Sequence, residues 1–228
     1  MIVLHLGLHK TGTTFLQRYI FPEMKNVNFI RELPVNFLSK DKINIISNEN
    51  LSGEPQIGID ARYKFLIAKG LAQVFPEAKI ILGVRGSKSW LRSIYYQYVK
   101  QGGIHDFDNW YDIIFDEDNL DFNRYIDCLQ SLFNDVLIYK YEDMKKNMDG
   151  VIKDICDFIG VDVPVYENIR TNVSMSENMM KLVRFLNQFQ RSDLNHKGFF
   201  KKNRHLNTNR VFDWYPHLKN RIQGGRGI

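Results

Sequence analysis

The stretch M-I-V-L-H-L-G-L-H-K-T-G-T-T, residues 1–14, decides the fold of this chain. Residues 2–6 are apolar apart from one histidine, which predicts a short buried strand. The turn G-L-H-K-T-G follows over residues 7–12, and residues 13–20 predict a helix entered through threonine. A strand that passes through a Gly-rich turn into a helix indicates a parallel α/β fold with a ligand site at the turn.

The turn has most features of a phosphate-binding loop. In the pattern G-x-x-x-x-G-K-[ST], backbone N–H groups surround a phosphate at the start of a helix. Gly7 and Gly12 take the two glycine positions, Thr13 replaces the lysine, and Thr14 keeps the hydroxyl position. The cation has moved into the loop as Lys10. Exposed amides, a helix N-terminus and an ammonium group remain, so we expect the loop to bind an anion.

Strand-like and helix-like segments alternate along the rest of the chain. Further strands are expected at 43–47, 79–84 and 135–140, with a weaker apolar segment at 27–30. Helices are expected at 61–75, 87–101, 121–133, 149–159 and 176–190, with a short helical insertion at 105–118. This order predicts an α/β three-layer sandwich with a central parallel sheet. We expect a single domain over 1–228, in which 1–190 is the core and 191–228 a basic C-terminal segment.

The composition is that of a folded protein, with 44% hydrophobic and 25% charged residues and a net charge of +5. Residues 195–228 hold eight Lys or Arg and one acid, a net charge of +7, whereas the remaining 194 residues net −2. The basic segment therefore predicts either contact with an anion or a solvated tail. No apolar run is long enough for a transmembrane segment and none resembles a signal peptide, so a cytoplasmic location is the default expectation. Cys128 and Cys156 show no zinc-binding spacing and are expected to be small buried residues.

A second anion site is expected after the strand at 79–84. Arg85 follows this strand directly, and Ser93 comes eight residues later in the predicted helix at 87–101. A guanidinium fork and a hydroxyl suit one phosphate group. Taken alone, the two residues fit a structural ion pair and a surface serine better than a phosphate site.

Taken together, the two sites resemble the sulfotransferases that use 3′-phosphoadenosine 5′-phosphosulfate (PAPS). The resemblance rests on H-K-T-G-T-T after the first strand and on Arg85 and Ser93 at their spacing of eight. L-I-Y-K-Y-E-D-M at 137–144, D-F-I-G-V at 157–161 and N-V-S at 172–174 resemble later landmarks of the family, in its bacterial and carbohydrate-type branch. One departure is Ser87, which stands where the family often has proline.

The resemblance implies a PAPS site that releases the product PAP and requires no metal. The residues implied to grip the 5′-phosphosulfate are those of the first loop, Lys10, Thr11, Gly12, Thr13 and Thr14. Arg85 and Ser93 are implied to grip the 3′-phosphate. Lys197 and Gly198 are a partial likeness to a late Arg-Lys-Gly cap on that phosphate, and Asn172 and Ser174 are candidates for closing the pocket. Trp90, Tyr95, Phe199 and Phe200 are candidates for stacking on adenine, although core packing is the commoner use of such residues.

Sulfuryl transfer needs a cation at the leaving phosphate and a base for the acceptor. Lys10 is the candidate for the first role, because negative charge develops on the bridging oxygen. Glu49 follows the strand at 43–47 and resembles the glutamate base of the heparan-modifying branch. His9, His5 and His105 are competing candidates, and His9 is the strongest because it adjoins Lys10. The implied acceptor is a saccharide or glycolipid hydroxyl or amine.

Two other functions remain open from the residues. A small-molecule kinase or other nucleotide-phosphate-binding protein would use the same loop, although the usual lysine and a Mg²⁺-binding aspartate are missing from the pattern. A polyanion-binding module would use the basic segment, but no DNA- or RNA-reading motif is present and nucleic acid is not an expected partner. The oligomeric state cannot be predicted from these patterns.

Overall fold

The computed structural model describes residues 1–31, 37–167 and 175–201. The chain divides into two compact units, one made of Met1–Arg92 with Asp116–Ile169 and the other of Ser93–Phe115 with Arg170–Ile228. Helix α3 (Ser87–Lys100) begins in the first unit and continues into the second. The prediction of a single domain stays a prediction.

The first unit is built on a parallel sheet of five strands. They are β1 (Ile2–His5), β2 (Val27–Ile30), β3 (Ile43–Ser47), β4 (Lys79–Val84) and β5 (Val136–Lys140), in the order β2-β3-β1-β4-β5. Val3 pairs with Ile45 on one side and with Lys79 on the other, so β1 lies in the centre. The carboxyl end of β1 therefore lies between the ends of β3 and β4, where ligands of such sheets bind.

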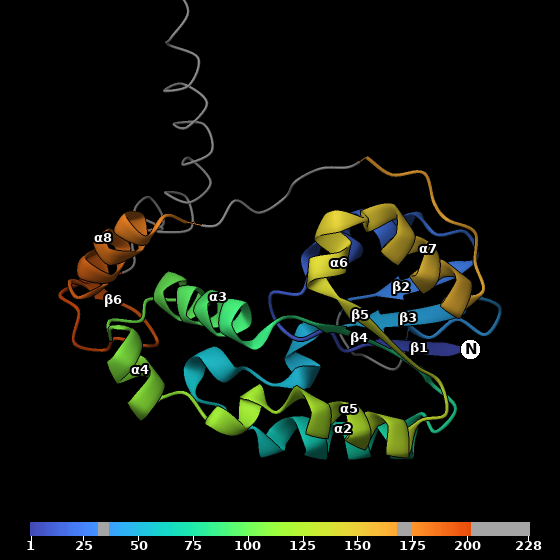
Figure 1. The fold of residues 1–228 in the computed structure, drawn as a ribbon, viewed down its shortest axis with the longest axis horizontal. Helices are drawn as coiled ribbons and strands as arrows, with labels where there is room; N and C mark the ends of the chain where they lie inside the picture. Colours follow the sequence, from blue (N-terminus) through green and yellow to red (C-terminus); the bar gives the residue numbers. More distant parts are fainter. Residues whose placement is uncertain (32–36, 168–174, 202–228) are drawn as a thin grey trace, which may run out of the picture. The chain divides into compact units, whose positions relative to one another are not determined.

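Helices cover both faces of this sheet (Figure 1). Helix α1 (Thr13–Phe15) continues as the π-helix η1 (Leu16–Ile20), and with α6 (Tyr141–Lys146) and α7 (Met148–Ile159) it packs on one face. Helices α2 (Arg62–Val74) and α5 (Phe122–Leu132) pack on the other. This confirms the predicted α/β three-layer sandwich.

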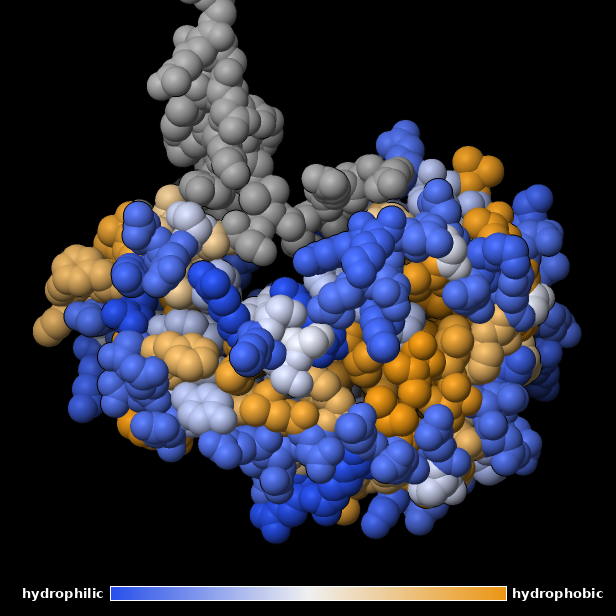
Figure 2. Space-filling model, in the orientation of Figure 1, coloured by the Kyte–Doolittle hydropathy of each residue, from blue (hydrophilic) through white to orange (hydrophobic). Residues whose placement is uncertain are grey.

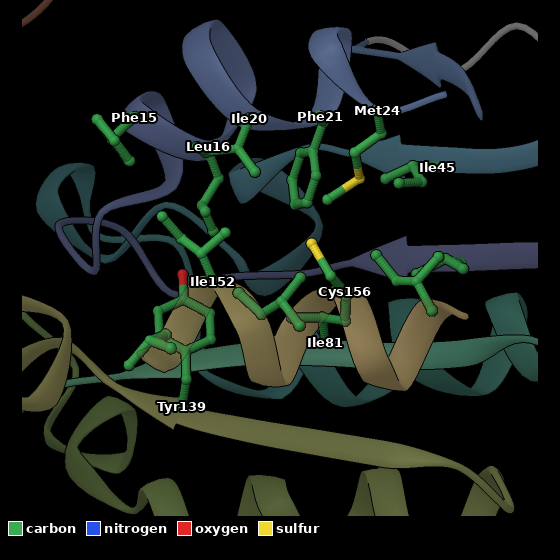
Figure 3. Packing of buried hydrophobic residues seen from close by; sticks show 14 of the residues in the cluster. Phe15, Leu16, Ile20, Phe21, Met24, Ile45, Ile81, Tyr139, Ile152 and Cys156 are labelled. Carbon is green, nitrogen blue, oxygen red and sulfur yellow. The ribbon is translucent and has the colours of Figure 1, made fainter. Parts of the chain in front are cut away.

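The alternation of apolar side chains along β1 explains the two cores. Val3 joins the cluster shown in Figure 3 with Phe21, Ile81, Ile152 and others, whereas the next residue, Leu4, joins the cluster under α2 and α5. Both side chains are fully buried, and each such burial contributes about 1.5–3 kcal/mol. Strands buried on both faces read as continuous apolar runs, which is why the sequence pattern found them.

The edge strands β2 and β5 are less buried than the three inner strands. On β5 three of the five residues are half-buried, and Figure 2 shows apolar side chains gathered over this strand. The weak segment at 27–30 forms the opposite edge strand β2, in which only Ile30 is buried. Partial burial needs fewer apolar residues, and this accounts for the weak signal of β2.

The described part of the second unit combines the end of α3 with α4 (Phe107–Ile113), α8 (Glu177–Asn187) and the short strands β6 (Gln190–Arg191) and β7 (Phe200–Lys201). Asn187 Nδ2 donates to the carbonyls of Val99 and Gly103 at 2.7 and 3.0 Å. Trp110 is fully buried against the rings of Tyr95 and Tyr98. The insertion predicted at 105–118 is thus a short helix, followed in the first unit by the 3-10 turn η6 (Glu117–Leu120).

Candidate active site

The loop between β1 and α1 has the backbone of a phosphate-binding turn. Lys10 and Gly12 both have positive φ angles, 68° and 94°. A positive φ at a lysine is uncommon, because the side chain crowds the backbone in the left-handed region. The loop is fixed to its neighbours by a hydrogen bond from the Leu8 amide to the Gly83 carbonyl at 3.2 Å. Within the loop, the Thr11 hydroxyl donates to the Leu8 carbonyl at 2.5 Å.

Two positions of the loop need glycine, because other side chains approach the backbone there too closely for a Cβ atom. A Cβ atom on Gly7 would lie 2.7 Å from Thr13 Oγ1, and one on Gly12 would lie 2.6 Å from Met144 Sδ. Gly12 precedes the first turn of α1 and no side chain caps that turn. The amides at this helix start are therefore available to an anion rather than to a capping residue.

The chemistry of the loop fits a phosphate or sulfate ligand. Thr13 Oγ1 is buried, and no partner for it exists among the residues that the structure describes. A buried hydroxyl without a partner is costly, so an outside acceptor would satisfy it. Thr14 lies half-buried beside it in α1, and Lys10 supplies the cation. Lys10, Thr11 and Gly12 thus lie in the loop, and Thr13 and Thr14 open α1 directly after it.

Arg85 connects the end of β4 to this loop. Its Nη1 donates to the Lys10 carbonyl at 3.2 Å and its Nε donates to Ser89 Oγ at 2.9 Å. The guanidinium lies 4.7 Å from the centre of the Tyr141 ring, within cation–π distance. Burial lowers the pKa of Arg85, opposed by Tyr141 and Glu142, but an arginine stays charged. The structure therefore brings the first predicted 3′-phosphate ligand to the phosphate loop.

The other predicted 3′-phosphate ligands belong to the second unit. Ser93 is the first residue of that unit, within α3. The Lys197 amide donates to Asn195 Oδ1 at 3.2 Å, and Gly198 packs against the backbone of Gln190 and Arg191. Their roles stay predictions. Asn172 and Ser174 lie outside the described residues.

Glu49 and His9 form a pair at the carboxyl ends of β3 and β1. Glu49 begins the 3-10 turn η4 (Glu49–Ser52), which Asn48 caps by accepting from the Asn50 amide at 2.9 Å. Glu49 Oε1 lies 3.7 Å from His9 Nδ1, with the glutamate side chain 37% exposed. His9 Nε2 donates to the Gly53 carbonyl at 2.9 Å. This bond places the proton of the neutral ring on Nε2 and leaves Nδ1 as an acceptor facing Glu49.

The electrostatics of His9 keep its ring neutral. Burial lowers its pKa, while the Glu49 carboxylate raises it by a smaller amount. The arrangement suits proton uptake by the carboxylate from a ligand hydroxyl or amine.

Trp90 packs in the core beside this site, the commoner of the two uses considered for it. Its indole Nε1 donates to the His9 carbonyl at 2.9 Å, its ring packs edge-on against Phe122, and it is 1% exposed. Trp90 therefore supports the loop from α3 and is not available to stack on adenine. Tyr95 is 3% exposed and equally enclosed, whereas Phe199 and Phe200 are exposed.

The remaining candidate histidines have structural surroundings. His5 is fully buried, and burial lowers its pKa to about 3. The His105 amide donates to the Tyr98 hydroxyl at 3.1 Å in the second unit. Within the described residues no cluster of His, Cys, Asp or Glu could hold a metal ion. Nor does any described helix have the length and hydropathy needed to cross a membrane.

Comparison with known proteins assigns the family. The model of the sulfotransferase domain matches residues 2–224, and the chain belongs to this family. The chain resembles the crystal structure of a sulfotransferase from Alicyclobacillus acidocaldarius with a TM-score of 0.57 and 13% identity, over 82% of this chain and 92% of that one. Mouse sulfotransferase SULT7A1 complexed with PAP matches with a TM-score of 0.47 and 16% identity, over 90% of this chain and 73% of that one. No curated protein matches. The fold is thus the P-loop-like α/β fold of sulfotransferases, and the general chemistry is sulfuryl transfer.

Proposed function

We propose that this protein transfers a sulfuryl group from PAPS to a hydroxyl or amine of a saccharide or glycolipid. The observation that carries the proposal is the Glu49–His9 pair, whose atoms Oε1 and Nδ1 are 3.7 Å apart. His9 is followed directly by Lys10 in the phosphate loop. A proton acceptor and a cation for the leaving group therefore lie on neighbouring parts of one site.

The loop residues hold the phosphosulfate end of the donor in this proposal. The amides at the start of α1, the hydroxyls of Thr13 and Thr14, and the Lys10 ammonium bind its anionic oxygens. Arg85 binds the 3′-phosphate in this proposal, and Ser93, Lys197 and Gly198 keep the roles that the family resemblance implies for them. When bound, PAPS supplies the activated sulfuryl group.

Lys10 stabilises the charge that develops on the leaving phosphate. The backbone around Lys10 is held at two carbonyls. Arg85 donates to the Lys10 carbonyl, and Trp90 donates to the His9 carbonyl. A cation on a fixed backbone needs less reorganisation when the charge develops. These protein cations neutralise the phosphates, so we expect no metal requirement.

Glu49 takes the proton from the hydroxyl or amine that receives the sulfuryl group, and His9 helps to hold that proton. Since His9 Nε2 donates to Gly53, Nδ1 presents a lone pair toward Glu49 Oε1. A proton taken up by Glu49 therefore has a second acceptor nearby, at His9 Nδ1.

Thermal denaturation with added nucleotides tests the donor. We expect PAP to raise the melting temperature in the presence of EDTA and ATP·Mg²⁺ to raise it less. Stabilisation by ATP·Mg²⁺ and not by PAP would instead support the alternative of a small-molecule kinase. Transfer of labelled sulfate from PAPS to a panel of saccharides, phenols and lipids then identifies the acceptor.

A further inference from the structure

A chain of buried polar groups connects to the phosphate loop from the sheet beneath it. His5, at the end of β1, is fully buried, and Tyr139 on β5 is 5% exposed. Ser47, the last residue of β3, and Gln17 on η1 are buried as well. These residues come from three strands and one helix, and all belong to the first unit.

The contacts connect these groups in a row. Gln17 Nε2 donates to both the carbonyl and the hydroxyl of Ser47 at 3.1 Å. Ser47 Oγ lies 2.7 Å from His5 Nδ1, and His5 Nε2 lies 3.3 Å from the Tyr139 hydroxyl. Buried polar groups that are all paired in this way hold their elements in one arrangement.

The row continues into the loop over Gly83. A Cβ atom on Gly83 would lie 2.5 Å from the Tyr139 hydroxyl and 2.7 Å from Thr11 Oγ1, so the two oxygens approach each other above this glycine. Burial raises the pKa of Tyr139 well above its usual value, and a hydrogen bond with Thr11 partly opposes the rise. Thr13 also lowers the pKa of Tyr139. Among the described residues, however, no group lies in hydrogen-bond geometry with Thr13 Oγ1.

The loop end of the row sets the direction of its hydrogen bonds. The Thr11 hydroxyl donates to the Leu8 carbonyl, so a bond between Tyr139 and Thr11 uses the Tyr139 proton. We infer that His5 Nε2 then donates to Tyr139 and that Ser47 donates to His5 Nδ1. This assignment needs a neutral His5, and burial keeps the ring neutral by lowering its pKa to about 3. The Thr13 hydroxyl is left to donate to a ligand.

We propose that Tyr139 and His5 are positioning residues that hold Thr11 of the phosphate loop in the geometry that binds the 5′-phosphate of the donor. The inference rests on the proposed function, because it takes PAP as the ligand of the loop. Tyr139 touches the loop and acts through Thr11. The same row passes through Ser47, two residues before Glu49, and therefore joins the loop to the strand that precedes the proposed base.

Calorimetric titration of Tyr139→Phe with PAP and with adenosine 3′-monophosphate tests the inference. The ratio measured is the dissociation constant of adenosine 3′-monophosphate divided by that of PAP. It gives what the 5′-phosphate contributes to binding. We expect the ratio to fall by about tenfold in Tyr139→Phe, since a buried hydroxyl network loses its central member. Ser47→Ala breaks the row between Gln17 and His5 and should lower the same ratio. A ratio equal to wild type in both variants would overturn the inference.

Tyr125→Phe is the matched control. Tyr125 is 1% exposed, and its hydroxyl has no hydrogen-bond partner among the described residues. Removal of this hydroxyl should leave the ratio and the melting temperature unchanged or raise the latter. An equal fall of the ratio in Tyr125→Phe would show a general effect of core changes and contradict the inference. A wild-type protein that binds no PAP would defeat the proposed function itself, and the inference with it.

Nitrogen NMR of His5 in the wild-type protein gives a test that needs no folded variant. The row predicts a neutral ring with its proton on Nε2 near neutral pH. A proton on Nδ1, or a charged ring, would contradict the direction of the row.

Discussion

The Arg85 guanidinium donates a hydrogen bond from Nη1 to the backbone carbonyl of Lys10 at 3.2 Å, although 75 residues separate them. Through this bond the proposed 3′-phosphate ligand supports the backbone of the proposed catalytic lysine. Trp90 donates in the same way to the carbonyl of the preceding residue, His9. Two consecutive carbonyls of the loop are thus held from the segment that follows β4.

Replacement of Arg85 should affect both ends of the donor. Arg85→Ala should weaken PAP binding more than tenfold, as is typical for a charge-assisted contact, and should abolish the preference for PAP over AMP. Competition binding with the two nucleotides measures the preference. Arg62→Ala removes an exposed arginine that pairs with Asp60 and serves as the control. If Arg85→Ala prefers PAP as strongly as wild type, Arg85 does not bind the 3′-phosphate.

Because Lys10 has a positive φ, two substitutions can distinguish the role of its ammonium group from the strain in its backbone. Lys10→Ala and Lys10→Gly should both largely abolish sulfate transfer, because both lack the ammonium group. The glycine variant should exceed the alanine variant by about 1 kcal/mol in free energy of unfolding, since glycine adopts a φ of 68° without crowding. Urea denaturation measures this difference.

Asn26 is the matched control, because it also has a positive φ, 59°, and lies outside the loop. Asn26→Gly should likewise be more stable than Asn26→Ala, and both should retain full transfer. Transfer by Lys10→Ala at the wild-type rate would exclude Lys10 from the reaction.

Glu49→Gln should reduce the transfer rate by about a hundredfold, a usual contribution of a general base. The affinity for PAP should stay near wild type, because the proposed role of the carboxylate involves the acceptor and not the phosphates. Single-turnover rates and PAP titration separate the two effects. Glu77→Gln changes an exposed glutamate and should alter neither quantity. An unchanged rate in Glu49→Gln would transfer the base role to another group.

Acid should destabilise the first unit through His5. Burial lowers the pKa of His5 from 6.5 to about 3. The unfolded chain binds a proton below about pH 6.5 and the folded protein does not, so the contribution of His5 is complete above that pH and is lost as the pH falls toward 3. The slope should be about 1.4 kcal/mol per pH unit, and His9, with its lowered pKa, adds in the same direction.

Denaturant unfolding at several pH values measures the slope, and His5→Gln should reduce it. The side chains around His5 are Ser47, Tyr139 and Phe21, none of which titrates in this range. An identical slope in the variant would show that His5 is not the group responsible.

Local patterns were sufficient to predict the sheet and the loop. The apolar runs at 2–6, 43–47 and 79–84 became β1, β3 and β4, and the glycine pattern located the loop with Lys10. These signals depend on neighbouring residues, which a single sequence contains.

The supports of the site could not be predicted, because they join distant residues. Trp90 and His9 are 81 residues apart, and Tyr139 and His5 are 134 apart. Nothing near His5 in the sequence distinguishes a buried network member from a catalytic histidine. The acceptor, the cytoplasmic location and the roles of Lys197 and Gly198 stay predictions.

Transfer of labelled sulfate from PAPS, with EDTA present, tests the central claim most directly. The wild-type protein and Lys69→Ala, which changes an exposed lysine, should both label a saccharide-type acceptor, and Lys10→Ala should not. Failure of the wild-type protein to label any saccharide, phenol or lipid acceptor would contradict the account, as would equal labelling by Lys10→Ala.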